Sequence, residues 1–364
     1  MTDTVLHLGG ASPYDVVVGR DLTGRLPGLL GERVQRVAVL YSDRQAGLAQ
    51  PLVDSLVEHH DVLALGLPDG EAAKTGAVAH DCWEALGERG FTRSDAVVTF
   101  GGGAVTDLGG FVAATWLRGV AVVHVPTTLL GMVEAAVGGK TGINTAAGKN
   151  LVGAFHEPAG VLCDLATLDT LPRPDLRAGL AEVVKCGFIA DPRILELVEE
   201  TEPEAVTPDS PVLRELVERA IRVKIGVVVG DLRETGADGG VGREVLNYGH
   251  TLGHAVERAE GYRMRHGDAV AIGCVYAAEL AGLAGVLDAD TVERHRQVLL
   301  RLGLPTTYAN AGFEELLAAM RVDKKARGSQ IRFVVLEALG RPVVLEPTED
   351  QLRAAWERIG GGAA

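Results

Sequence analysis

Short apolar runs alternate with amphipathic stretches through the first half of the chain. Four runs rich in β-branched residues have the length of strands, at residues 34–42, 61–68, 95–103 and 120–128. Between them, apolar residues recur at the spacing of one helix face, over residues 45–59, 74–89 and 104–117. Strands that alternate with helices are typical of a mainly parallel sheet covered by helices. We therefore predict an α/β, Rossmann-like fold for this half.

The pattern changes near residue 172, where the prolines of LPRPD interrupt the chain. Beyond this point the apolar spacing is helical over long stretches, at residues 176–190, 211–230, 243–260, 267–286 and 289–302. Residues 330–346 have the composition of a strand pair. We predict an α/β domain over residues 1–171 and a mostly α-helical domain over residues 172–364, with the active site in the cleft between them.

The composition limits the classes of partner. The 364-residue chain has a formal net charge of −14, so it lacks the basic stripe that nucleic-acid binding requires. No apolar run reaches the length of a membrane span, and the first residues lack the segments of a signal peptide. The four cysteines form no CxxC pair, which is typical of reduced, buried thiols. We expect a cytoplasmic protein that binds neither nucleic acid nor membrane.

Glu182, His250 and His266 are candidate ligands for one divalent metal ion. His250 lies in NYGHTLGH at residues 247–254, on the same helix face as His254. His266 opens the next helical stretch, and Glu182 lies upstream in AGLAEVVKCGF. Imidazole and carboxylate ligands with an open position are typical of a catalytic zinc site. Two histidines on one helix face also occur in ordinary cores, so the HxxxH spacing alone leaves both interpretations open.

Three loops that follow predicted strands have the residues of a dinucleotide site. GGGAVTD at 101–107 opens a helix, and DGEAAK at 69–74 and VPTT at 125–128 each end a strand. Glycines let the backbone approach a ligand closely, and a helix N-terminus offers N–H groups to a pyrophosphate. Asp43 follows the 34–42 strand, where it can accept hydrogen bonds from a ribose. The glycines do not form GxGxxG after the first strand, so an ordinary Rossmann dehydrogenase is not indicated.

Basic side chains gather in VGGKTGINTAAGKN at residues 137–150. Lys140, Lys149 and Asn150 stand there among small residues, an arrangement that suits a phosphate or carboxylate. Lys185 lies one helical turn after the candidate glutamate ligand, so we expect it to face the metal site. Further cationic candidates are Arg118, Lys224, Arg243 and the pair Lys324–Lys325.

Seven motifs together resemble those of one family over nearly the whole chain. GGGxxxD, RG…VPTTLL, VGGKTGxN…GKN, GLAEVVK, NYGHTLGH, HG and DKK occur in this order, and the sequence thereby resembles the 3-dehydroquinate synthases, prototype of the sugar phosphate cyclases. The resemblance implies an N-terminal NAD-binding domain, a helical metal-binding domain and a homodimer.

The resemblance also implies a role for each matching residue. Zinc, with cobalt as the alternative, would be bound by Glu182, His250 and His266. The implied NAD contacts are Asp43, Asp69, Gly70, Glu71, Lys74, Gly102, Gly103, Asp107, Thr127, Thr128, Lys140, Lys149, Thr167 and Thr170. The implied substrate contacts are Lys140, Asn150, Lys185, Lys224, Arg243, Asn247, His254, Glu134 and one or both of Lys324 and Lys325, with Arg118 reaching the site of the partner subunit.

The implied substrate is a sugar acid phosphate, 3-deoxy-D-arabino-heptulosonate 7-phosphate. Oxidation by NAD, β-elimination of phosphate, re-reduction and intramolecular aldol closure would give 3-dehydroquinate for aromatic amino acid biosynthesis. One position departs from the family, because Glu134 stands where aspartate is usual. We interpret it as a tolerated exchange of one acid for another. The alternative is an aminodehydroquinate synthase acting on the 4-amino analogue in antibiotic biosynthesis.

A metal-dependent polyol dehydrogenase of the glycerol dehydrogenase type is the main hypothesis of another reaction class. It shares the sheet, the glycine loop and the acid-plus-histidine metal site, but it does not need the cationic residues. It would also produce net NADH and release no phosphate. A non-enzymatic NAD- or metal-sensing module is a third hypothesis. Such a module would lack part of the site, whereas every expected ligand is present here.

Overall fold

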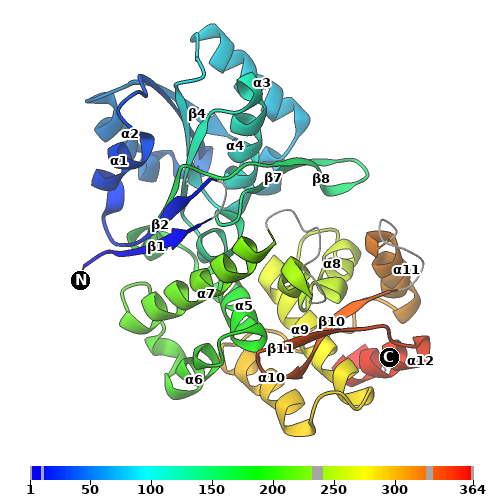
Figure 1. The fold of residues 1–364 in the computed structure, drawn as a ribbon. Helices are drawn as coiled ribbons and strands as arrows, with labels where there is room; N and C mark the ends of the chain where they lie inside the picture. Colours follow the sequence, from blue (N-terminus) through cyan, green and yellow to red (C-terminus); the bar gives the residue numbers. More distant parts are fainter. Residues whose placement is uncertain (1, 10–11, 232–240, 325–330, 362–364) are drawn as a thin grey trace. The chain divides into compact units, whose positions relative to one another are not determined.

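The chain divides into two compact units, Met1–Leu171 and Pro172–Ala364 (Figure 1). The computed structural model describes residues 2–9, 12–231, 241–324 and 331–361, without the side chains of 322–324. The first unit is α/β and the second is mostly helical. The predicted fold class is therefore confirmed.

One mainly parallel sheet forms the centre of the first unit. Within the described residues its order is β1-β2-β9-β6-β5-β3-β4. Every neighbouring pair in it is parallel except β1 with β2. The strands are β1 (Thr4–Leu8), β2 (Tyr14–Gly19), β3 (Arg36–Ser42), β4 (Asp61–Leu67), β5 (Ala96–Gly101), β6 (Ala121–Pro126) and β9 (Gly160–Asp164).

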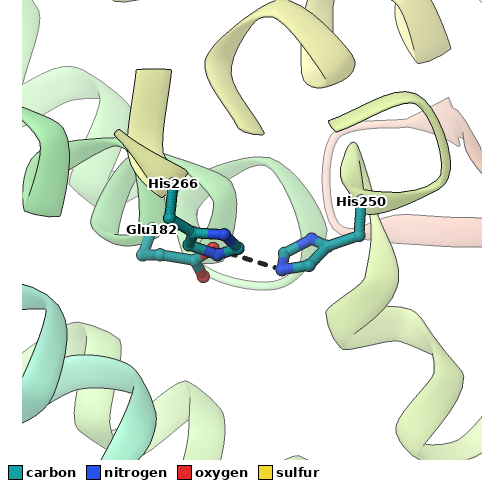
Figure 2. Close-up of side chains that lie close together, drawn as sticks. All are labelled: Glu182, His250 and His266. Atoms are coloured by element: carbon teal, nitrogen blue, oxygen red, sulfur yellow. Dashed lines mark ion pairs between the residues drawn. The ribbon is translucent and has the colours of Figure 1, made fainter. Parts of the chain in front are cut away.

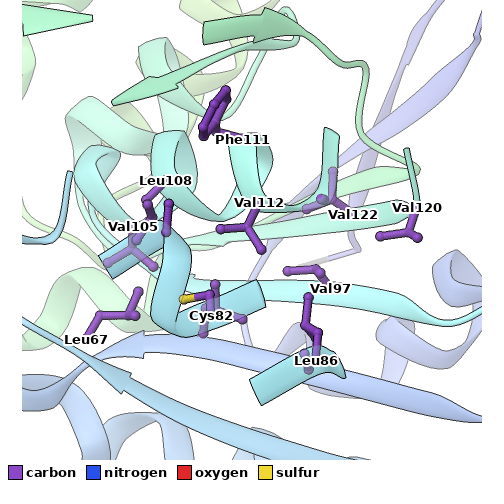
Figure 3. Packing of buried hydrophobic residues seen from close by; sticks show 14 of the residues in the cluster. Leu67, Cys82, Leu86, Val97, Val105, Leu108, Phe111, Val112, Val120 and Val122 are labelled. Atoms are coloured by element: carbon purple, nitrogen blue, oxygen red, sulfur yellow. The ribbon is translucent and has the colours of Figure 1, made fainter. Parts of the chain in front are cut away.

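Helices cover both faces of this sheet. They are α1 (Leu26–Leu30), α2 (Ala46–Val57), α3 (Gly76–Glu88) and α4 (Gly103–Thr115). Leu40 of β3 packs in a cluster with side chains of α3 and α4, shown in Figure 3. Its neighbour Val39 packs in a second cluster with side chains of α1 and α2. Because successive side chains of a strand point to opposite faces, a strand covered on both sides is a continuous apolar run.

In the first unit, the apolar pattern predicts β3, β4, β5 and β6 but not the other strands. It does not predict β1, β2 or β9, nor the separate hairpin of β7 (Lys140–Thr145) and β8 (Gly148–Phe155). The hairpin carries the glycines and lysines of the motif at 137–150, whose composition indicates a ligand loop and hides its strand character.

Helix α9 (His266–Leu283) is the centre of the second unit. It is buried on every side, as its continuous apolar sequence requires, and it packs against α5, α8, α10, α12 and β10. The surrounding elements are α5 (Arg173–Ile189), α6 (Arg193–Glu200), α7 (Pro211–Gly230), α8 (His250–Ala259), α10 (Ala289–Arg301), α11 (Phe313–Lys324), α12 (Glu349–Trp356), β10 (Phe333–Ala338) and β11 (Arg341–Leu345). The predicted strand pair is confirmed as the antiparallel β10–β11.

The predicted helix over 243–260 is wrong at its start. Residues Gly242–Asn247 form a 3-10 turn, η8, and α8 begins only at His250. The two are separated by Tyr248, which is extended, and Gly249, whose φ of 78° is left-handed. The break makes His250 the first residue of a helix.

None of the described helices is long and apolar enough to cross a membrane.

The pH dependence of stability should reveal the buried His124 of β6. Its Nδ1 lies 2.8 Å from Thr99 Oγ1, and burial, with a smaller effect of His156, lowers its pKa to about 3. The unfolded chain binds this proton below about pH 6.5, so the stabilisation from a neutral His124 is present above that pH and is lost as pH falls towards 3. The stability advantage of the wild type over His124→Gln should shrink by about 1 kcal/mol between pH 7.5 and 5.5. Urea unfolding at both pH values measures it, and a constant difference would contradict the assignment.

Candidate functional site

The second unit brings Glu182, His250 and His266 together. Glu182 projects from α5, whereas His250 and His266 are the first residues of α8 and α9. One ligand atom from each lies within 4.8 Å of the other two. Figure 2 shows how the three side chains lie close together. The sequence expectation that these side chains form one cluster is confirmed.

Two glycines fix the positions from which these side chains start. A Cβ on Gly267 would lie 1.7 Å from the carbonyl oxygen of Ala178, so the first turn of α9 presses its backbone against α5. A Cβ on Gly273 would lie 1.8 Å from the carbonyl oxygen of Gly249, which brings the start of α8 equally close to α9. Only glycine permits such approaches, and they place the three ligand candidates on adjoining backbones.

Both imidazoles are oriented by a hydrogen bond at Nδ1. The Nδ1 of His250 lies 3.1 Å from the carbonyl oxygen of Tyr248, and the Nδ1 of His266 lies 3.1 Å from Oε2 of Glu257. Both oxygens accept hydrogen bonds, so each Nδ1 carries a proton and each Nε2 is the atom left for a ligand. Each Nε2 lies 3.4 Å from Oε1 of Glu182.

This geometry fits a divalent ion with nitrogen and oxygen ligands. Two ligands about 2 Å from one tetrahedral ion lie about 3.3 Å apart, close to the spacing of Oε1 from each imidazole. Within the described part of the chain, Oε1 of Glu182 is buried and makes no hydrogen bond. Buried polar atoms are normally satisfied, so a cation at this point would complete the set. The mixture of two imidazoles and one carboxylate suits Zn²⁺ or Co²⁺.

Lys185 forms an ion pair with Glu182, the pairing that their spacing predicts. Burial alone would raise the pKa of Glu182. The Lys185 ammonium and the two histidines lower it by more than burial raises it, so the pKa lies well below its usual range. Burial and the nearby Lys185 charge lower the pKa of His250, which keeps it neutral. For His266, burial is outweighed by the carboxylates of Glu182 and Glu257, which raise its pKa to about 9. An ion bound here would have to displace a proton from His266.

His254 does not belong to the triad. It lies one turn after His250, with the two rings 5.3 Å apart, but it is exposed and its atoms are outside the cluster of possible ligands. Its exposed position at the edge of the cluster makes it accessible to a bound molecule.

Three predicted cations of the second unit are buried on α5 or on elements that pack against it. Lys185 donates to the carbonyl oxygen of Leu246 at 2.9 Å, which ties α5 to η8 just before Asn247. Arg243 of η8 and Lys224 of α7 are both buried, and their elements pack against each other and against α5. The Lys324 side chain and Lys325 lie outside the described residues.

The loops predicted for a dinucleotide share one edge of the sheet in the first unit. Five neighbouring parallel strands, β9, β6, β5, β3 and β4, end at this edge. The predicted residues follow these carboxyl ends: Thr167 and Thr170 after β9, Thr127 and Thr128 after β6, Gly102 and Gly103 after β5, Asp43 after β3, and Asp69, Gly70 and Glu71 after β4. Such an edge is where open parallel sheets bind nucleotides.

The glycine loop is tightly packed. A Cβ on Gly103 would lie 3.1 Å from the Cβ of Ala135, and one on Gly102 would lie 3.2 Å from Thr128 Cγ2. Gly102 caps α4, so the first N–H groups of that helix open onto this edge. Nearby, Gly66 leaves room for Asp43, whose Oδ1 would be 2.0 Å from a Cβ there.

Lys74, in the loop that follows β4, connects α4 to the hairpin. Its buried ammonium lies 2.6 Å from Oδ2 of Asp107 and 2.5 Å from Oδ1 of Asn150. On the hairpin, the backbone N–H of Asn150 donates to Oδ1 of Asn144, whose amide donates in turn to Glu71 at 2.6 Å. The structure thus joins four of the residues expected from the sequence, Glu71, Lys74, Asp107 and Asn150. Lys149 lies 3.6 Å from Glu71, and Lys140 begins β7 with its side chain exposed.

The remaining two predicted residues have unusual backbone conformations. Glu134 is partly buried in a π-helix at Gly131–Ala135, a rare backbone form that is frequent at functional sites. Arg118 is exposed in a strained loop in which it has a φ of 70° and Leu117 a φ of 48°.

Three residues of these sites are not predicted from the sequence. Glu257 orients His266, Asn144 holds Asn150, and Gln45 accepts a hydrogen bond from Thr127 at 3.0 Å. Glu257 offers a signal, because it follows His250 by two helical turns in HTLGHAVE and an acid near ligand histidines is a usual orienting group. The other two depend on backbone placement that residue spacing does not reveal.

Comparison with known proteins assigns the family. The model of the 3-dehydroquinate synthase N-terminal region matches residues 64–178, and that of the C-terminal region matches residues 179–326. A 3-dehydroquinate synthase of Thermobifida fusca is 58% identical, with 100% of this chain and 98% of that protein covered. One of Streptomyces avermitilis is 56% identical, with 98% of each covered.

Solved structures agree on the fold. The 2-epi-5-epi-valiolone synthase of Streptomyces hygroscopicus, solved with NAD⁺ and Zn²⁺, has a TM-score of 0.86 at 26% identity and covers 98% of this chain and 99% of its own. A probable glycerol dehydrogenase of Sinorhizobium meliloti has a TM-score of 0.66 at 17% identity, covering 94% and 95%, and is alike in fold alone. The chain belongs to the 3-dehydroquinate synthase family.

Proposed function

We propose that this chain is a 3-dehydroquinate synthase that converts 3-deoxy-D-arabino-heptulosonate 7-phosphate into 3-dehydroquinate and phosphate. One observation carries the proposal: the Glu182–His250–His266 cluster is accompanied by three buried cations, Lys185, Lys224 and Arg243. Positively charged side chains bind carboxylates and phosphates, and this substrate carries both groups. The 58% identity to a relative of this name supports the same assignment.

The proposed cofactors are NAD and zinc, with cobalt as the alternative metal. Glu182, His250 and His266 would hold the metal, and the carboxyl edge of the sheet in the first unit would hold NAD. When bound, NAD supplies reversible hydride transfer and the metal supplies Lewis-acid stabilisation of a substrate alkoxide.

The chain's own residues then supply binding, orientation and charge. Lys185, fixed by Glu182 and the Leu246 carbonyl, presents a positive charge beside the metal ligands in a buried setting. Lys224 and Arg243 add positive charge for the carboxylate or phosphate, where low polarity strengthens the attraction. In the first unit, a hydrogen bond from Lys74 fixes the side chain of Asn150 on the hairpin. Asn150 can therefore orient a substrate group without prior rearrangement. The leaving phosphate is itself well placed to take the proton during elimination, so the site needs no separate protein base.

A polyol dehydrogenase would use the same fold but not these cations. Its substrates carry no phosphate or carboxylate, so it has no anionic group for Lys224 and Arg243 to bind. The likeness to a glycerol dehydrogenase at 17% identity concerns the fold alone. The cations therefore favour the cyclase.

We also propose that the enzyme is a cytoplasmic homodimer. The four cysteines are free and buried, as expected for a reducing compartment. Arg118 is exposed in its strained loop, which leaves it available to a second copy of the chain.

His250→Ala should abolish metal binding and lower turnover by roughly three orders of magnitude, because ligands of one ion act as a unit. His254→Ala, one turn along the same helix, is the matched control and should lower the rate while keeping stoichiometric zinc. Metal analysis after gel filtration, together with kcat, measures both. Equal zinc loss in the two variants would contradict the assignment of the ligands.

The complete reaction should require NAD⁺ yet leave no free NADH. Oxidation and re-reduction take place on one bound cofactor, so phosphate and 3-dehydroquinate should appear in equal amounts while absorbance at 340 nm stays flat. A phosphate-release assay run beside that absorbance measures both. Growth of NADH in step with turnover, without phosphate release, would favour the polyol dehydrogenase instead.

Glu134→Asp tests the choice between the ordinary substrate and its 4-amino analogue. If Glu134 is a neutral replacement, kcat/KM for each substrate should be almost unchanged. A misplaced polar contact is worth roughly 1–3 kcal/mol, so a specificity role would shift the ratio of the two kcat/KM values about tenfold or more. We expect a change of less than twofold, and a larger shift would support the aminodehydroquinate synthase.

A further inference from the structure

Two buried side chains outside the predicted site are connected to His250. Tyr248 precedes it by two residues, and His295 projects from α10. Both are fully buried, and the Tyr248 hydroxyl lies 2.9 Å from Nε2 of His295. A buried hydroxyl bonded to a buried imidazole is a specific polar contact in an otherwise apolar core.

The direction of this hydrogen bond follows from the other nitrogen of His295. Nδ1 lies 2.7 Å from the carbonyl oxygen of Thr291, which only accepts, so Nδ1 carries the proton. Burial lowers the pKa of His295 to about 4, which keeps the ring neutral and leaves Nε2 as an acceptor. The Tyr248 hydroxyl therefore donates to His295. The carbonyl oxygen of Cys274, at 3.5 Å, is too distant to compete for that proton.

The two rings are also fixed by packing. Phe188 of α5 stacks on the His295 ring, with centroids 3.8 Å apart and planes 19° apart. It meets the Tyr248 ring edge-on at 6.3 Å. Helices α5 and α10 thus hold the acceptor in place, and the hydroxyl of Tyr248 has one well-defined partner.

The backbone of Tyr248 transmits this position to His250. Its carbonyl oxygen accepts the Nδ1–H of His250 at 3.1 Å, which leaves Nε2 facing Glu182. Gly249 between them is pressed against α9, since a Cβ there would lie 2.6 Å from Cys274 Sγ. The peptide is therefore held by the glycine contact on one side and by the Tyr248 ring on the other.

We propose that Tyr248 and His295 are positioning residues for His250. Their hydrogen bond holds the Tyr248 carbonyl where it selects the His250 tautomer that directs Nε2 to the metal. The inference rests on the metal centre of the proposed function and extends it to a residue of α10, 45 positions from the ligand. Groups that orient metal ligands typically change metal affinity by 10–100-fold when they are removed, and a partner acting through one further bond should have a smaller effect.

Tyr248→Phe in the full-length chain provides the test. The apoprotein is titrated with Co²⁺ in competition with a chromophoric chelator, and the d–d absorption of the bound Co²⁺ is recorded. We expect affinity about three- to tenfold weaker than wild type and an altered d–d spectrum. Tyr276→Phe is the matched control, because Tyr276 is also buried and its hydroxyl donates to the Leu352 carbonyl at 2.9 Å. It should lower the melting temperature by a similar amount and keep the wild-type Co²⁺ affinity and spectrum.

Two variants of His295 decide the matter if Tyr248→Phe does not fold. His295→Leu removes the acceptor and should weaken Co²⁺ binding as Tyr248→Phe does, whereas His295→Gln offers an amide oxygen and should restore part of the affinity. The double variant Tyr248→Phe/His295→Leu should bind Co²⁺ no more weakly than either single variant, because both changes remove the same hydrogen bond. If Tyr248→Phe and His295→Leu bind Co²⁺ as tightly as Tyr276→Phe does, this inference is overturned but the proposed metal centre is not. A wild-type chain that binds no Co²⁺ would overturn the proposed metal centre together with it.

Discussion

The second unit depends on one buried carboxylate. Removing Glu182 from water costs several kcal/mol unless opposite charge accompanies it, and Lys185 on the same helix supplies that charge at Oε2. The other oxygen, Oε1, faces two imidazole nitrogens at 3.4 Å and no hydrogen-bond donor among the described residues satisfies it. The ion pair therefore balances the charge of the carboxylate but leaves one of its oxygens unsatisfied. A divalent cation at that oxygen would make the cluster net positive, which suits an anionic substrate.

Helix packing, and not local propensity, gives this cluster its geometry. His250 and His266 each begin a helix, so their directions are set by where α8 and α9 start. Those starts are fixed by contacts that only glycine allows, at Gly267 against α5 and at Gly273 against the turn before α8. Packing contacts this close leave little freedom to the backbone, so the helix starts set the directions of the ligand side chains. The hydrogen bond between Tyr248 and His295 restrains the same turn through the side chain of Tyr248.

The sequence predicts those parts of the site that depend on local spacing. The pairing of Glu182 with Lys185 follows from one helical turn, and the strands of the first unit follow from apolar runs buried on both faces. The start of α8 does not follow, because Val245, Leu246 and Tyr248 continue the helical spacing while Gly249 breaks the helix. For the same reason, spacing cannot separate His250 from His254, which would share a face of one continuous helix. Strands β2 and β9 pair with each other although they are far apart in the chain. Each is followed by a 3-10 turn and not directly by an α-helix, so the alternation of strand and helix does not reveal them.

The fold alone does not specify the chemistry, since a glycerol dehydrogenase shares it at 17% identity. This chain combines a net charge of −14 with lysine and arginine side chains that are almost fully buried. An acidic surface repels a doubly anionic substrate at long range, but exposed charges are screened beyond about 10 Å at 0.1 M salt. Buried cations act in surroundings of low polarity, where one contact outweighs many screened charges. Under the proposed function, recognition of the phosphate and the carboxylate is therefore local and depends on the few buried cations.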